Sequence, residues 1–202
     1  GKGLDNFEPD LVVNHNIYRG ELLKRAGHYS KLFFENGWEY SRQTALLRGM
    51  KGGTSVRDGI FENGFKVGDM SKTNNNHLIE SITINLQAAF TDATTKVDVA
   101  KRFATDGTES GWIFMIKNRG GQVIDVEKTP SMELASHSND LLDRYAFKSD
   151  TKEYIHTFVG DVDARDIEGA WKVNKDGVPL EFIPNPNFAG TPNPSTVLGD
   201  IS

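Results

Sequence analysis

The sequence predicts a single domain of the α+β class, and three observations support this class. Short apolar segments typical of buried strands alternate along the chain with segments of helical periodicity. The 202 residues are enough for one domain with a sizeable core, and the 37% of hydrophobic residues is ordinary for a folded protein. The chain has no cysteine, which excludes disulfides, thiolate metal sites and a cysteine nucleophile.

The charge pattern narrows the classes of partner. The 23 Lys and Arg residues against 28 Asp and Glu residues give a net charge of −5, which argues against a general nucleic-acid coat or a polybasic membrane anchor. No apolar run approaches the roughly 20 residues that cross a bilayer, so no membrane span is expected. Because the chain opens at Gly1 without a methionine, we expect it to be part of a longer polypeptide.

The first predicted element is a helix. After a polar lead-in over residues 1–15, apolar residues recur at helical spacing over 16–34, and an Asn-Gly pair ends the pattern. A glycine-dense stretch over 49–55 predicts a mobile loop, because glycine adopts positive φ angles without strain. A short apolar patch over 59–65 follows this loop.

The middle of the chain predicts a helix between two strands. Residues 71–77 are polar and predict a loop, and residues 78–90 could form a helix or a strand. Alternating Ile and Leu residues favour a strand for the later half of 78–90. Residues 95–104 have the periodicity of a helix, and the run Trp-Ile-Phe-Met-Ile over 112–116 is typical of a buried strand.

The last third of the chain predicts further short elements and a tail. A Gly-Gly pair should turn the 112–116 strand into a second strand over 122–126, which would make a hairpin. Three further elements are expected: a helix over 136–145 and strands over 154–159 and 167–173. Five prolines and several asparagines from residue 179 onward predict that residues 183–202 are a tail or linker.

Several common catalytic motifs are missing. The sequence has no phosphate-binding loop that ends in Gly-Lys-Ser/Thr, no Gly-x-Ser-x-Gly nucleophile turn and no paired-histidine zinc helix. The histidines show no metal-ligand spacing, so no metal site is predicted. They are His15, His28, His77, His137 and His156.

An ordered set of short motifs stands out. Arg48 precedes the glycine-dense stretch and an Ile-Phe-x-x-Gly-Phe patch, and a predicted strand then ends in Ala89-Phe90-Thr91. The next helix contains Val-x-x-Ala-x-x-Phe-Ala, and a later segment contains Asp150 and Glu153 at Asp-x-x-Glu spacing. In order and spacing, this series resembles the mono-ADP-ribosyltransferase toxins of the cholera toxin and heat-labile enterotoxin type, whose site is summarised as Arg…Ser/Thr…Glu.

The resemblance implies a fold and a domain organisation. The fold would be the ADP-ribosyltransferase fold, with two packed antiparallel β-sheets, flanking helices and a cleft for NAD between the sheets. The ADP-ribosyltransferase domain would cover residues 1–182, with a helical lead-in over 1–42 and a catalytic core over 43–173. Residues 183–202 would then be a Pro/Asn-rich tail.

The resemblance also implies the residues of the site. Glu153, Arg48 and Thr91 would be the catalytic residues, with Arg48 holding NAD. Gly49, Phe90, Thr91 and Trp112 would complete the binding site for NAD, which is the co-substrate, and no metal is implied. Arg19 is a competing candidate for the arginine because an aromatic residue precedes it.

The residue types suit this chemistry. Cleavage of the bond between nicotinamide and ribose produces an oxocarbenium-like centre, which the fixed carboxylate of Glu153 would stabilise. Arg48 can hold a pyrophosphate through several charge-assisted hydrogen bonds, which the point charge of a lysine does less well. A hydroxyl group such as that of Thr91 can fix the orientation of the carboxylate.

Two departures from the pattern bear on the site. After Thr91 the chain continues with Asp92-Ala93, where the toxins have Thr-Ser, and Thr94 or Thr95 could supply the hydroxyl instead. Thr151 stands where arginine-modifying relatives carry a glutamate, so the acceptor is left open. Thr151 would lie on the acceptor side of the site, where Asp150 could supply the missing carboxylate.

The resemblance therefore predicts an NAD-dependent toxin or effector domain that is secreted or delivered into a target cell. It would transfer ADP-ribose to a macromolecule, and the net charge favours a protein acceptor over nucleic acid. Two alternatives remain at this stage: an NAD glycohydrolase that uses the same site with water as acceptor, and a non-enzymatic target-binding module of a toxin.

Overall fold

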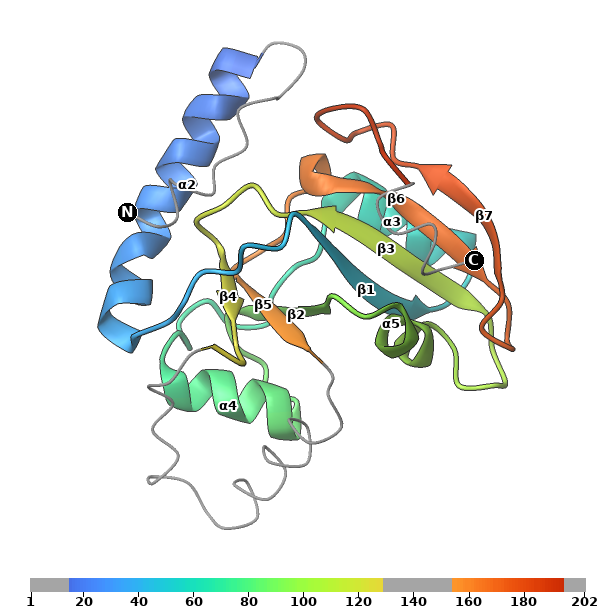
Figure 1. The fold of residues 1–202 in the computed structure, drawn as a ribbon, viewed down its shortest axis with the longest axis horizontal. Coiled ribbons are helices and arrows are strands. Elements are labelled where there is room, and N and C mark those ends of the chain that lie inside the picture. Colours follow the sequence, from blue (N-terminus) through green and yellow to red (C-terminus); the bar gives the residue numbers. More distant parts are fainter. Residues whose placement is uncertain (1–14, 129–153, 195–202) are drawn as a thin grey trace.

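The computed structural model describes residues 15–128 and 154–194, and this part of the chain forms one seven-stranded antiparallel sheet with flanking helices (Figure 1). The helices are α2 (His15–Asn36), α3 (Thr54–Asn63), α4 (Asn75–Ile84), α5 (Val97–Ala104) and the 3-10 helix η2 (Ala164–Asp166). The strands are β1 (Ala45–Lys51), β2 (Phe90–Thr94), β3 (Gly111–Lys117), β4 (Val123–Asp125), β5 (Ile155–Val159), β6 (Ile167–Val173) and β7 (Pro179–Pro184). The α+β class predicted from the sequence is confirmed.

The sheet has two halves that meet at a narrow junction. Its strand order is β4-β5-β2-β1-β3-β6-β7, and we call β1, β3, β6 and β7 the frame and β4, β5 and β2 the short-strand half. All of β1 pairs with β3, whereas β1 and β2 share a single register pair, Leu47 with Thr94. We call this junction the seam. The two sheets expected from the sequence are thus two halves that remain joined at the seam (Figure 1).

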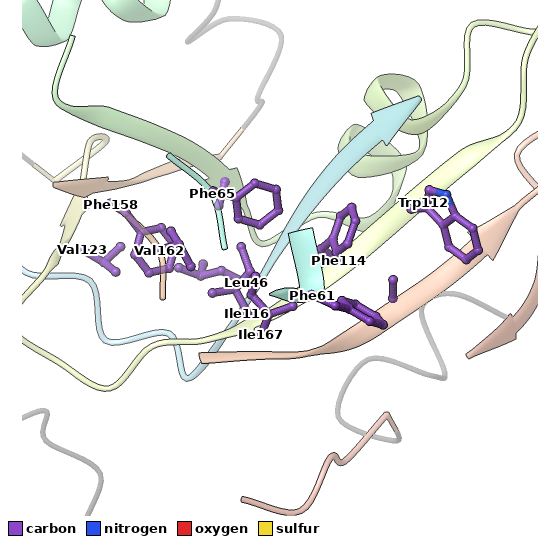
Figure 2. Close-up of a cluster of buried hydrophobic side chains, with 12 residues drawn as sticks. Leu46, Phe61, Phe65, Trp112, Phe114, Ile116, Val123, Phe158, Val162 and Ile167 are labelled. Atoms are coloured by element: carbon purple, nitrogen blue, oxygen red, sulfur yellow. The ribbon is translucent and has the colours of Figure 1, made fainter. Parts of the chain in front are cut away.

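The frame carries the main core on one face. Phe114 on β3 is fully buried, and its ring meets the rings of Phe61 and Phe65 edge-on at 6.0 and 5.3 Å. Figure 2 shows this cluster, with Trp112 at one end and Phe158 at the other. The cluster joins α3 and the frame to β5, so it spans both halves of the sheet on this side.

Two further clusters cover the rest of the sheet. On the opposite face of the frame, α5 packs Ala100 and Ala104 against Leu47 and Ile113. A third cluster joins α2 and α4 to the short-strand half, through residues such as Phe33 and Leu78. No helix of the described residues is long and apolar enough to cross a membrane.

Helix α2 matches the helix predicted over residues 16–34.

The strand favoured for the later half of residues 78–90 is wrong. It was inferred from the alternation of Ile82, Ile84 and Leu86, but the segment up to Ile84 is helical. Helix α4 continues to Ile84, with Leu78 and Ile82 buried one turn apart on the same face. Asn85 ends the helix in the left-handed conformation with φ 55°. Burial at helical spacing therefore decides this segment.

The hairpin predicted over residues 112–126 is wrong. Strand β4 pairs with β5, and the neighbours of β3 are β1 and β6. Both glycines of the Gly-Gly pair have positive φ, 93° at Gly120 and 83° at Gly121, so they redirect the chain out of the frame. The turn residues were identified correctly, but a turn does not specify which strand becomes the partner.

The glycine-dense stretch is also more ordered than expected. Strand β1 runs through Gly49 to Lys51, and α3 begins at Thr54. A Cβ atom at Gly49 would lie only 2.0 Å from the carbonyl oxygen of Ala100, so a glycine is required for α5 to approach β1 this closely. Packing against α5 therefore explains this glycine without any ligand.

The predicted tail is wrong for residues 183–194. Strand β7 pairs with β6, and Asn185 is only 3% exposed. The Asn185 amide donates to the carbonyl oxygens of Ala164 and Ile167, at 2.9 and 3.0 Å. Satisfied asparagine side chains thus fix a proline-rich segment that composition alone assigns to a tail. Residues 195–202 and the helix predicted over 136–145 lie outside the described residues.

Candidate active site at the seam

Arg48 lies on β1 in the seam between the two halves of the sheet. Its guanidinium Nη1 donates to the backbone carbonyl oxygen of Asp92 on β2 at 2.5 Å, and its Cζ lies 5.3 Å from the centre of the Phe65 ring. The Nε atom is buried and has no hydrogen-bond partner. A buried guanidinium nitrogen without an acceptor is costly, so Arg48 carries hydrogen-bonding capacity that the described residues do not use.

The electrostatics of Arg48 point in the same direction. Burial lowers the pKa of its guanidinium below the usual value, and the nearby Asp92 carboxylate opposes this shift. An arginine remains charged in proteins, so a desolvated cation stands in the seam. Such a cation binds phosphate oxygens strongly because little water screens the interaction.

Arg48 lines two cavities. The first, which we call the helix cavity, has a volume of about 200 Å³ and is lined by β1, β2, α5, the end of α4 and Ile155. The second, which we call the loop cavity, has a volume of about 360 Å³ and is lined by residues 65–68, residues 85–88 and the start of β2. Arg48, Asn85 and Asp92 line both cavities, so one extended ligand could contact these three residues from either side.

Lys66 supplies a second cation to the loop cavity. It lines this cavity together with Arg48, and its Nζ lies 3.6 Å from an Asp161 carboxylate oxygen at the surface. Its side chain is 66% exposed, so this ion pair is weak and easily exchanged for another anion. The loop cavity therefore presents one half-buried and one exposed cation to a ligand that carries more than one negative charge.

The structure brings some of the predicted site residues together with Arg48. Phe90 and Thr91 line the loop cavity with Arg48, and Phe90 also packs edge-on against Trp38 at 5.8 Å. Gly49 lines the helix cavity. Thr91 was expected at the end of a strand, but β2 begins at Phe90 and continues to Thr94, so Thr91 is an early strand residue and is buried.

Trp112 lies away from both cavities. Its indole Nε1 donates to the carbonyl oxygen of Gly53 at 3.0 Å, and the guanidinium of Arg57 covers its ring at 5.1 Å. The residue is 2% exposed and belongs to the core cluster of the frame (Figure 2). The described contacts of Trp112 are therefore those of a core residue, and it does not line either cavity beside Arg48.

Glu153, Thr151 and Asp150 lie outside the described residues. The chain is described again from Tyr154, which has a φ of 51° and lies under the ammonium group of Lys96 at 4.6 Å. The next residue, Ile155, begins β5 and lines the helix cavity. The side chain of Arg19, the competing arginine, is likewise not described.

Sequence reasoning did not select Asn85 and Thr157, nor the cavity residues Lys66 and Asp92. Asn85 lines both cavities in its left-handed conformation at the end of α4, and Thr157 holds the Asp92 carboxylate from β5. An asparagine that follows an apolar helical stretch could have indicated the helix end. Nothing in the sequence pairs Thr157 with Asp92, because that contact depends on the register between β2 and β5.

A Ser-His-Asp grouping lies in the short-strand half but is buried. His156 Nδ1 lies 2.8 Å from Ser41 Oγ, and Asp125 on β4 is the register partner of His156. Burial lowers the pKa of His156 below its usual value, and Asp125 opposes this shift. Ser41 is 1% exposed, which leaves no room for a substrate at its hydroxyl, so this grouping joins β5 to the segment before β1.

Comparisons with known proteins place the chain in a family. The Scabin-like family model matches residues 54–188. The chain belongs to the Scabin-like family. No curated protein matches the sequence significantly.

Solved structures of the Scabin toxin from Streptomyces scabies share the fold. The complex of Scabin with NADH has a TM-score of 0.53 and 18% identity, and the match covers 75% of this chain and 79% of Scabin. A substituted Scabin matches over 92% of this chain and 85% of its own, with 18% identity and a TM-score of 0.51. A guanine-specific ADP-ribosyltransferase with NADH and GDP is similar with a TM-score of 0.52 and 17% identity, over 75% of this chain and 81% of that one.

These matches decide several expectations from the sequence. The ADP-ribosyltransferase fold is confirmed, and the family match agrees with the expected class, since Scabin is a toxin whose structure was solved in complex with NADH. The narrower assignment to the cholera toxin type is not confirmed, because the matching family is the Scabin-like one. Within the described residues, no group of acidic or histidine side chains could hold a metal ion.

Proposed function

We propose that this chain transfers ADP-ribose from NAD to an acceptor at the seam and releases nicotinamide. The observation that carries the proposal is Arg48, whose buried Nε lacks an acceptor between two cavities. In this proposal the guanidinium of Arg48 binds the pyrophosphate of NAD, and Lys66 adds a second cation on the side of the loop cavity. The two cavities together accept a ligand that extends past Arg48 in both directions.

Glu153 is the proposed catalytic carboxylate. The bond between ribose C1′ and the nicotinamide nitrogen breaks, and its electron pair leaves with the nicotinamide. The positive charge that develops on the ribose is stabilised by a fixed carboxylate. The sequence supports this role, because Glu153 lies two residues before Ile155, and Ile155 lines the helix cavity. Phe90, Thr91 and Gly49 are proposed to shape the site around NAD.

The acceptor then attacks C1′ and loses a proton. We propose that this acceptor is a guanine base, because Thr151 offers no carboxylate to activate an arginine side chain and a guanine-specific enzyme shares the fold. Asp150 remains a candidate to take the proton. A protein acceptor, which the net charge of −5 favours over a long nucleic acid, is the second candidate. Delivery of the domain into a target cell is part of the same proposal.

Nicotinamide release tests the catalytic proposal. The Glu153→Gln substitution removes the charge and keeps the shape, so we expect the rate to fall by about 10²–10³, while NAD binding remains within about threefold. Glu181→Gln on β7, remote from both cavities, is the matched control and should keep full activity. More than about a third of the original activity in Glu153→Gln would remove Glu153 from the proposal.

The acceptor is tested by mass spectrometry with isotope-labelled NAD. The reaction is run in parallel with GDP, duplex DNA, agmatine and a poly-arginine peptide, and with no acceptor. Labelled ADP-ribose on GDP or DNA supports a guanine acceptor, and rapid modification of agmatine would overturn the argument from Thr151. Nicotinamide release at the same rate with and without every acceptor would instead indicate an NAD glycohydrolase.

A further inference from the structure

Asp92 places a negative charge at the centre of the candidate site. Asp92 lines both the helix cavity and the loop cavity, as Arg48 does. Among the described residues that line the two cavities, Asp92 is the only one with a carboxylate. A ligand that binds along Arg48 therefore meets one fixed anion, and its own charge distribution must be compatible with that anion.

The position of this carboxylate is fixed by the sheet. Thr157 is fully buried, is the register partner of Asp92 on β5, and donates from Oγ1 to Asp92 Oδ1 at 2.8 Å. The backbone carbonyl oxygen of Asp92 accepts a hydrogen bond from Arg48 Nη1. The cation and the anion are thus held by one strand residue, and the carboxylate cannot turn away without losing the bond to Thr157.

The charges of NAD indicate which part of the molecule lies beside Arg48 and which lies beside Asp92. Its pyrophosphate is anionic, so it is attracted to Arg48 and repelled by Asp92. Its nicotinamide ring is cationic in the oxidised form and neutral in the reduced form, so only the oxidised ring is attracted to a carboxylate. We propose that Asp92 receives the nicotinamide ribose end of NAD and makes the site prefer the oxidised over the reduced dinucleotide.

The same placement suits the reaction, and the inference rests on the proposed function. As the bond between C1′ and the ring nitrogen breaks, the ring leaves as neutral nicotinamide and the positive charge passes to the ribose. A carboxylate beside both groups remains paired with the charge while it moves, so the electrostatic stabilisation persists into the transition state. Asp92 therefore contributes to the selection of the substrate and also to turnover.

Equilibrium titrations with NAD and NADH test the inference without relying on turnover. They use the full chain in a Glu153→Gln background, which slows consumption of NAD, and compare it with the Asp92→Asn and Thr157→Val variants. We expect Asp92→Asn to weaken NAD binding about tenfold and to change NADH binding less than about twofold, because only the oxidised ring loses an electrostatic partner. Thr157→Val keeps the charge, so the preference for NAD should remain within about threefold.

Two controls keep this result interpretable. Asp176→Asn removes an exposed carboxylate in the turn between β6 and β7 and should leave both affinities unchanged. Thermal unfolding of Asp92→Asn shows whether the variant is folded, and Asp92→Ser provides a second uncharged variant if it is not. An unchanged ratio of the two affinities in both folded variants would overturn the role of Asp92.

The two hypotheses can fail separately. If the unsubstituted chain releases nicotinamide from NAD but substitution of Asp92 leaves the affinity ratio unchanged, the inference fails and the proposed function stands. If the unsubstituted chain neither binds NAD nor releases nicotinamide, the proposed function fails and the inference fails with it. Both hypotheses are supported if the unsubstituted chain releases nicotinamide and if Asp92→Asn lowers the ratio of NAD affinity to NADH affinity about tenfold.

Discussion

The two halves of the sheet differ in how completely their strands are paired. In the frame, β3 has a paired strand on both sides and is buried along nearly its whole length between α3 and α5. In the short-strand half, β4 has three residues, and β2 and β5 have five each. The frame supplies Arg48 and the short-strand half supplies Asp92, so the candidate site forms where the long paired strands of the frame meet the shorter strands.

Two arginines, Arg119 just after β3 of the frame and Arg48 in the seam, show the same difference at the level of side chains. Arg119 is 4% exposed and binds the Asp166 carboxylate, the carbonyl oxygen of Ala189 and the ring of Phe188. Arg48, in contrast, has a buried Nε without a partner. A structural arginine is surrounded by acceptors, whereas the arginine of the seam keeps one donor unused, which is expected of a residue that binds a ligand.

The largest expected effect tests whether the frame carries the stability. Phe114→Ala removes a fully buried ring that contacts Phe61 and Phe65, and we expect a loss of about 3–5 kcal/mol in the free energy of unfolding. Urea unfolding measures it, with Leu180→Ala on the exposed edge of β7 as the control. A loss below about 1 kcal/mol would show that the stability does not reside in the frame.

The next effect separates binding from stability at the seam. Arg48→Lys keeps the charge but loses the planar guanidinium, so the Kd for NAD should rise at least about tenfold, or about 1.4 kcal/mol. Titration with NAD measures this change, and thermal unfolding should change little. Arg57→Lys, over the ring of Trp112, is the control outside the cavities. If Arg19→Lys weakens binding and Arg48→Lys does not, Arg19 is the NAD-binding arginine.

The smallest expected effect is a change in stability with pH that depends on His156, which joins β5 of the short-strand half to the segment before β1. The pKa of His156 is lowered by burial, so the folded protein favours its neutral form. Its contribution to stability is complete above about pH 6.5 and falls as the pH decreases below that value, because the unfolded chain binds the proton first. We expect a relative loss of about 1 kcal/mol between pH 7 and pH 5, measured by thermal unfolding of the unsubstituted chain against His156→Gln.

The buried carboxylate of Glu168 makes stability depend on pH in the opposite direction. The comparison of His156→Gln with the unsubstituted chain cancels this contribution. Burial raises the pKa of Glu168, so its contribution to stability is complete below about pH 4.5 and is lost as the pH rises. This contribution is present in both proteins and cancels in the difference. His28→Gln, at an exposed position on α2, provides the control substitution. Identical pH profiles for His156→Gln and the unsubstituted chain would exclude the role of His156.

Local patterns predicted the elements better than they predicted the neighbours of those elements. The apolar run of β3 and the periodicity of α5 were sufficient to identify both. Burial of both faces gives a strand an unbroken apolar run, and burial of one face gives a helix apolar residues at helical spacing. The pairing of β4 with β5 was not predictable, because these strands are separated in the sequence by residues 126–154. The attachment of residues 185–194 was missed because it depends on hydrogen bonds of asparagine side chains, such as those from Asn185 to Ala164 and from Asn187 to Phe61.

The site was predictable in the same uneven way. Arg48 and Thr91 were selected by order and spacing and Phe90 for its ring, and the structure places all three at the loop cavity. Trp112 was selected for its ring alone, and rings serve the core more often than ligands. Asp92 was noted only as a departure from a motif, because its contacts with Thr157 and Arg48 arise from strand register.

The pairing of β7 has a mechanical consequence for the molecule. Strand β7 is the outermost strand of the frame, and the end of it that leads into Asn185 pairs at Gly169. A pulling force applied at residue 194 would first load the hydrogen bonds from Asn193 N to Glu168 and from Ala189 N to the carbonyl oxygen of Arg165. It would then load the Asn185 hydrogen bonds and open the β6–β7 hairpin one pair at a time, like a zipper. Such sequential opening requires less force than shearing, so force spectroscopy should detect β7 detaching before the rest of the frame yields.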